Sequence, residues 1–197
     1  FAVLKLWAAI FGRGDVALRG FSLLADLGMV ALLYALGRRL WNTGVGALAA
    51  LCASISPPLV MYAQEARMYS LVTALVVAAT YCLAGLPDER PTMRRRWAGL
   101  YAVCMAAALY SHHVAWLAFG AHAVVLLILA ARRRDWLPLV AGVLVVVLYL
   151  PQVPLTLQQI AVARGMSWKP HVSVSFMLTD LWLFLNLGWA DGRRFLD

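Results

Sequence analysis

Seven apolar stretches, separated by short polar segments, constrain the fold of this chain more than any other feature. A helix needs roughly 20 mostly apolar residues to cross the hydrocarbon core of a membrane, which is about 30 Å thick. The stretches that approach this length are residues 21–37, 43–58, 68–86, 97–110, 114–131, 136–150 and 172–190. Some are short, notably 97–110, so we expect their helices to extend further or to be surrounded by protein. The sequence predicts an all-α, polytopic membrane protein with about seven transmembrane helices.

The composition argues against a soluble domain and against a nucleic-acid partner. Of 197 residues, 63% are hydrophobic and 13% are charged, whereas a soluble domain is about half apolar and a quarter charged. The formal net charge is +8, but the basic residues form short clusters between apolar runs, as in the loops of membrane proteins. The three cysteines lie inside apolar runs, so we interpret them as packing residues. We therefore expect membrane lipid, and no nucleic acid, around the chain.

The basic residues also predict the orientation in the membrane. One side holds 11 of the 17 lysines and arginines, and the other side holds 6. Because cytoplasmic loops carry the excess of Lys and Arg, we assign the richer side to the cytoplasm. Its basic positions are residues 38–39, 90, 94–96, 132–134 and 193–194. We expect a multi-pass protein of the cell (plasma) membrane, with its site on the extracytoplasmic face, where the outer segments are residues 1–20, 57–67, 111–113 and 151–171.

The second of these outer segments has a high density of polar groups. Pro57 and Pro58 end one helix, because proline lacks a backbone N–H and crowds the preceding turn, and a new apolar run follows soon after. The segment predicts a tight hairpin that presents Glu65 and Arg67 at the outer membrane surface.

The residue types in this hairpin suit a phosphate and a sugar. Arg67 has a planar guanidinium that donates hydrogen bonds to phosphate in pairs. Glu65 is able to bind a hard cation or to accept a hydrogen bond from a sugar hydroxyl. If the segment is helical, Tyr62 and Tyr69 share a face with Glu65. The alternative is that Glu65 and Arg67 are ordinary interfacial charges beside tyrosines of the aromatic belt.

Three pieces of the sequence resemble a known family. Residues 56–71 resemble the S-P-x(n)-Y-x-Q-E-A-R-M-Y-x-L signature of bacterial family 39-like glycosyltransferases. These are multispan enzymes of the GT-C superfamily, related to protein mannosyltransferases and to lipid A aminoarabinose transferases. Residues 6–40 resemble the part of the family after its first outer loop, and residues 110–113 resemble its Y-T-H-Y turn, with His113 in place of the usual tyrosine. The resemblance spans most of residues 1–155.

The resemblance implies a fold and an activity. It implies GT-C-type architecture and a polyprenyl-phosphate-dependent hexosyl- or pentosyltransferase, which moves a sugar from its lipid-linked donor to a hydroxyl of a glycan, lipid or protein acceptor. We expect residues 1–197 to form a single transmembrane glycosyltransferase domain. The family's acid proposed as catalytic base lies in its first outer loop. We therefore expect an internal fragment, incomplete at the N-terminus and at the C-terminus, whose base lies upstream of Phe1.

The resemblance also implies a cavity at the outer face, lined by Glu65, Arg67 and Tyr69, with His112 pointing into it. The outer segment that begins at residue 151 could cover this cavity. The candidate substrate-binding residues are Tyr62, Gln64, Glu65, Arg67, Tyr69, His112 and Lys169. No cofactor is certain, and a divalent metal that joins Glu65 and His112 remains an alternative because both are suitable ligands.

Several of these residues have plainer interpretations. Adjacent histidines at a helix end, as at His112 and His113, are commonly interfacial hydrogen-bonding groups, and Lys169 also fits a solvated loop lysine. His122 fits a satisfied intramembrane histidine. Asp26 and Asp180 lie inside predicted spans, where an unpaired acid costs on the order of 2 to 3 kcal/mol or more, so both are weaker site candidates. For the whole chain, the alternatives are a transporter or flippase of lipid-linked sugars and a structural subunit of a membrane complex.

Overall fold

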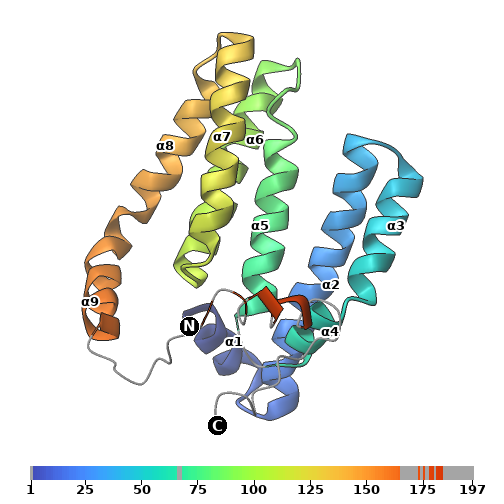
Figure 1. Ribbon diagram of the computed structural model, residues 1–197, viewed down its shortest axis with the longest axis vertical. Helices are drawn as coiled ribbons and strands as arrows, with labels where there is room; N and C mark the ends of the chain where they lie inside the picture. Colours follow the sequence, from blue (N-terminus) through green and yellow to red (C-terminus); the bar gives the residue numbers. More distant parts are fainter. Residues whose placement is uncertain are drawn as a thin grey trace.

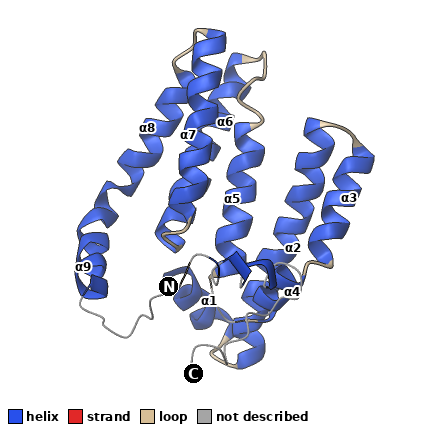
Figure 2. Ribbon diagram, in the orientation of Figure 1, coloured by secondary structure: helices blue, strands red, loops and turns tan. Residues whose placement is uncertain are grey.

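The computed structural model describes residues 2–65, 68–164, 173, 175, 178–179 and 181–183 (Figure 1). All the regular structure in this part of the chain is helical, which confirms the predicted all-α fold (Figure 2). The helices are α1 (Ala2–Phe11), α2 (Asp15–Leu40), α3 (Thr43–Ser54), α4 (Pro57–Gln64), α5 (Tyr69–Leu83), α6 (Pro91–Ser111), α7 (Ala115–Arg133), α8 (Leu137–Tyr149), the 3₁₀ turn η1 (Leu150–Gln152) and α9 (Val153–Arg164).

The long helices run up and down a bundle, and the short ones gather at one end. Figure 1 shows α2, α3, α5, α6, α7 and α8 extending in one general direction, with α1, α4 and α9 at the lower end. Across the bundle, α3 packs against α2, α2 against α5, α5 against α6, α6 against α8, and α8 against α7. The core is centred on α5 and α6, where Ala79, Tyr101, Met105 and Ala108 are fully buried.

Three helices of the described part are long and apolar enough to cross a membrane. They are Asp15–Leu40, Ala115–Arg133 and Leu137–Val162, the last of which combines α8, η1 and most of α9. A fourth span results if α3 and α4, which are bent by 59° at their junction, count as one. The structure thus supports a polytopic membrane protein, and the number seven stays a prediction, because most of residues 172–190 lies outside the described residues.

Two predicted boundaries differ from the structure because arginine-rich and proline-rich segments are helical. The predicted span 97–110 extends back to Pro91 and so includes three consecutive arginines, which precede the apolar part of the helix. The predicted outer segment from residue 151 continues instead from α8 through η1 into α9. Pro151 and Pro154 fall at the starts of η1 and α9, where a missing backbone N–H costs little.

The prolines of the predicted hairpin also act differently from the prediction. α3 ends at Ser54, before the prolines, and Pro57 and Pro58 form the first turn of α4. α4 then ends at Gln64, and Glu65 has an extended backbone with φ −90° and ψ 137°. A single helix through residues 62–69, which would place Tyr62, Glu65 and Tyr69 on one face, therefore does not form.

The three described basic clusters lie together at the upper end of the bundle, at the α2–α3, α5–α6 and α7–α8 junctions (Figure 1). We call this the arginine end. The guanidinium carbon of Arg39 lies 4.8 Å from the ring centroid of Tyr81 and 4.4 Å from that of Trp97. Arg94 forms an ion pair with Asp135, which links the start of α6 to the α7–α8 junction. These arginines hold helices to one another.

Candidate functional site

A cavity of about 810 Å³ lies at the end of the bundle opposite the arginine end. We call this end the cavity end. Residues from α1, α2, the start of α5, the end of α6, the α6–α7 turn, η1 and α9 line the cavity. This size lies within the range of about 300–1,000 Å³ that is typical of small-molecule sites.

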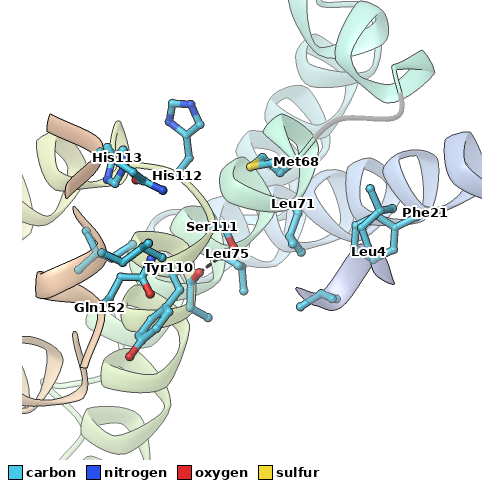
Figure 3. Close-up of a pocket in the computed structure, with 15 residues that line it drawn as sticks. Leu4, Phe21, Met68, Leu71, Leu75, Tyr110, Ser111, His112, His113 and Gln152 are labelled. Atoms are coloured by element: carbon cyan, nitrogen blue, oxygen red, sulfur yellow. Dashed lines mark hydrogen bonds between the residues drawn. The ribbon is translucent and has the colours of Figure 1, made fainter. Parts of the chain in front are cut away.

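The lining of the cavity differs between its two sides (Figure 3). The side formed by α1, α2 and α5 is apolar, and its residues include Leu4, Phe21, Met68, Leu71 and Leu75. The side formed by the α6–α7 turn, η1 and α9 is more polar, and its residues include Ser111, His112, His113, Gln152 and Gln159. The cavity can therefore hold a ligand that is part apolar and part polar.

Aromatic rings connect the α4–α5 junction with the α6–α7 turn. The ring centroids of Tyr62 and Tyr69 lie 4.7 Å apart, and that of His112 lies 5.5 Å from that of Tyr69. The extended backbone at Glu65 turns the chain, so the two tyrosines meet across the turn. The structure thus brings together three candidate residues from α4, α5 and the α6–α7 turn.

Side-chain contacts join α9 to the α6–α7 turn and to α8, next to the polar side of the cavity. Nε2 of His113 lies 2.9 Å from Oε1 of Gln159 on α9. Tyr149 is 3% exposed, its ring packs edge-on against Trp116, and its hydroxyl lies 2.8 Å from that of Thr156. The sequence predicts a covering segment here, but no local motif marks Tyr149 or Gln159.

A family model described as dolichyl-phosphate-mannose-protein mannosyltransferase matches residues 1–155 of the chain. The chain belongs to this family. Comparisons with curated proteins and with solved structures gave no match. The match includes the α4–α5 junction, the α6–α7 turn and all the cavity-lining residues up to Leu155. The protein is thus a mannosyltransferase-like membrane glycosyltransferase, a class that takes a sugar from a lipid-linked donor and passes it to an acceptor.

The candidate residues of this glycosyltransferase occupy different positions relative to the cavity. Gln64 is exposed at the end of α4, and Glu65 is half-buried after it. His112 lines the cavity directly. Arg67 and Lys169 lie outside the described residues, as does Asp180.

Two polar residues of the spans lie apart from the cavity lining. Asp26 is half-buried on α2, and its Oδ1 has no hydrogen-bond partner in the described structure. His122 is 9% exposed on α7, and its Nε2 lies 3.2 Å from the hydroxyl oxygen of Thr80. That hydroxyl donates to the carbonyl oxygen of Val76, so Nε2 of His122 must be the donor to Thr80. His122 therefore links α7 to α5.

The described residues contain no group of three or more histidine, cysteine or acidic side chains arranged to hold a metal ion. The alternative with two protein ligands, Glu65 and His112, therefore has no third protein ligand among them.

Proposed function

We propose that this protein transfers a sugar from a polyprenyl-phosphate-linked donor to a hydroxyl of a glycan, lipid or protein acceptor on the extracytoplasmic face. The observation that carries the proposal is the two-sided cavity. Its apolar side, formed by α1, α2 and α5, suits the first isoprene units of the lipid, and its polar side suits a sugar and a phosphate. In this proposal residues 1–197 act as one domain.

The position of the cavity supports the extracytoplasmic side. It lies at the end of the bundle opposite the three described basic clusters. Lysine and arginine concentrate in cytoplasmic loops, so the arginine end belongs to the cytoplasm and the cavity end to the outside. A polyprenyl-linked sugar that has reached the outer leaflet would enter the cavity from the bilayer.

The proposed chemistry is a single displacement with inversion at the anomeric carbon. The acceptor oxygen bonds to this carbon, the carbon–oxygen bond to the phosphate breaks, and the polyprenyl phosphate leaves with the bonding electron pair. The acceptor proton passes to a general base. Arg67, together with Lys169, stabilises the charge on the departing phosphate, while Glu65 orients the sugar or holds a cation.

Transport of a lipid-linked sugar without cleavage is the competing function, since it also needs a cation for the phosphate. Transporters place their sites near the middle of the membrane, commonly at broken helices between repeats. Here the cavity lies at one end of the bundle, and the family is one of transferases. Both observations favour transfer.

The test is an assay of the purified full-length protein in proteoliposomes. Polyprenyl phosphates that carry radiolabelled mannose, other hexoses or pentoses are supplied with an extract of cell-envelope glycans, lipids and proteins. We expect one donor to give a labelled acceptor and free polyprenyl phosphate in equal amounts, and nucleotide sugars to give none. Movement of intact donor between leaflets without cleavage would show a transporter and refute the proposal.

A further inference from the structure

The ring of His112 is held by its own turn in a way that fixes which nitrogen carries the proton. The backbone N–H of Val114 donates to Nδ1 of His112, with 3.1 Å between the two nitrogens. A ring nitrogen that accepts a hydrogen bond has no hydrogen of its own. The proton of the neutral ring is therefore on Nε2, and a doubly protonated ring would lose this contact.

The α6–α7 turn provides this hydrogen bond without any ligand. His112 follows the last residue of α6 and has an extended backbone, with φ −159° and ψ 140°. Val114 directly precedes α7, and the first N–H groups of a helix have no acceptor within the helix. The side chain of His112 supplies an acceptor for one of them. The orientation of the ring is thus part of the fold of the turn.

The opposite edge of the ring is available to a ligand. His112 is one of the residues that line the cavity, and its Nε2 makes no hydrogen bond to any residue that the structure describes. The neighbouring His113 differs, because its Nε2 bonds to the amide oxygen of Gln159. Of the two adjacent histidines, one fastens the turn to α9 and the other keeps a donor for a bound molecule.

We propose that His112 is a neutral hydrogen-bond donor that binds a phosphate oxygen of the lipid-linked substrate through Nε2–H. The assignment rests on the proposed function. It is incompatible with a metal ligand or a general base at this position, because both roles need a lone pair on Nε2 while Nδ1 is already an acceptor. A histidine that binds a metal normally donates from its other nitrogen, which is the reverse of the arrangement here.

A neutral donor suits a phosphate oxygen that gains negative charge during the reaction. Hydrogen bonds to an anionic oxygen are roughly twice as strong as those between neutral groups. As the bond from sugar to phosphate breaks, negative charge on the phosphate oxygens increases, so the hydrogen bond from Nε2 strengthens in the transition state.

Two amide substitutions at His112 distinguish the roles of its two ring nitrogens. His112→Gln places an amide N–H near the position of Nε2, whereas His112→Asn reaches only the position of Nδ1. We expect kcat/KM for the lipid-linked donor to stay within about threefold of the wild type in His112→Gln. It should fall roughly 10- to 100-fold in His112→Asn and in His112→Phe. The control is His122→Gln, at a histidine outside the cavity lining that keeps an amide N–H for Thr80, and it should cost less than about threefold.

Equal elution in size-exclusion chromatography and equal melting temperature must first show that the variants fold. The proposal would be overturned if His112→Gln lost as much kcat/KM as His112→Asn. It would also be overturned if all three His112 variants kept wild-type activity.

Nitrogen-15 NMR of histidine-labelled protein in nanodiscs measures the tautomer directly. The signals of His112 are those that disappear in His112→Gln. We expect an unprotonated Nδ1 and a protonated Nε2 near neutral pH, and a shift of the Nε2 signal when polyprenyl phosphate is added. A protonated Nδ1, or no shift at saturating lipid, would overturn the proposal. If the shift occurs but the wild type transfers no sugar, the binding role stands and the proposed function fails.

Discussion

The two ends of the bundle use their polar residues in different ways. At the arginine end, Arg39 stacks on two rings, Arg94 pairs with Asp135, and the Arg133 guanidinium donates to the carbonyl oxygen of Pro87. At the cavity end, polar side chains such as His112 and Gln152 line an open space. Several charges at the more charged end are thus satisfied by contacts within the protein. The site that we propose lies where polar groups face a cavity, at the end of the bundle with fewer arginines.

The assignment of the two ends to the two sides of the membrane is the sharpest test of this comparison. In a background with the three native cysteines changed to alanine, Gln64→Cys at the cavity end should react fully with an impermeant thiol reagent outside intact cells. Thr92→Cys at the arginine end should react only after the membrane is opened. Labelling of Thr92→Cys in intact cells would reverse the orientation and remove the extracytoplasmic site.

Conservative changes of arginine should affect the two ends very differently. Arg67→Lys keeps the charge but loses the paired donors, so we expect kcat/KM for the lipid-linked donor to fall at least about tenfold. Arg67→Ala should cost about 10²- to 10³-fold, the usual cost of losing a donor to a developing charge. The control is Arg95→Lys at the arginine end, an exposed position, which should leave transfer unchanged. Near-wild-type turnover in Arg67→Lys would contradict a phosphate role.

A change at Arg39 should lower stability and leave the chemistry intact. Arg39→Ala removes two contacts with aromatic rings and a donor to the carbonyl oxygen of Tyr81. We expect the melting temperature in detergent to fall by about 2–8 °C, with transfer per folded molecule unchanged. Arg38→Ala is the control, because the Arg38 guanidinium lies over Tyr34, a ring of its own helix. An equal drop in both variants would show that general charge, and not the stacking of Arg39, stabilises this end.

The smallest expected effect is on the pH dependence of stability at the α5–α6 junction. The Arg90 guanidinium lowers the pKa of Asp88 to about 2, mainly through hydrogen bonds to its carboxylate. A lowered pKa adds stability above the unfolded pKa of about 4, and this contribution is lost as the pH falls toward 2.

Asp88→Asn should therefore melt slightly below the wild type at pH 6, because surface pairs contribute little. The two melting temperatures should converge as the pH falls from about 4 toward 2. A difference that persists at the lowest pH would mean that Asp88 acts through its shape and not its charge.

The helices were largely predictable because hydrophobic stretches of this length have few alternatives. The apolar run 21–37 lies within α2, and 114–131 lies almost wholly within α7. The predicted helix boundaries were wrong where a helix does not begin or end with its apolar run. Arginines extend helices readily, so α6 begins in the charged segment before its apolar part. The bend between α3 and α4 falls inside an apolar run that gave no sign of it except the prolines.

The candidate site was less predictable because it depends on contacts between distant residues. The sequence singled out Tyr62, Tyr69 and His112, but the proximity of Tyr69 to His112 follows only from the packing of α5 against α6. Gln159 has no motif, and its position against His113 depends on the path of the chain through η1. The tautomer of His112 could not be predicted from the sequence either. It depends on the extended backbone of the turn, which brings Nδ1 within hydrogen-bond distance of the Val114 N–H.

The contact between α2 and α3 has a consequence for biosynthesis. A Cβ atom on Gly37 would lie 2.7 Å from Cα of Gly46, and a Cβ on Gly46 would lie 2.5 Å from the carbonyl oxygen of Tyr34. Backbones that approach this closely gain their packing energy without help from later helices. The α2–α3 hairpin can therefore assemble as soon as both helices have left the translocon. It would then already be in place in the bilayer when α5, which packs against α2, is inserted.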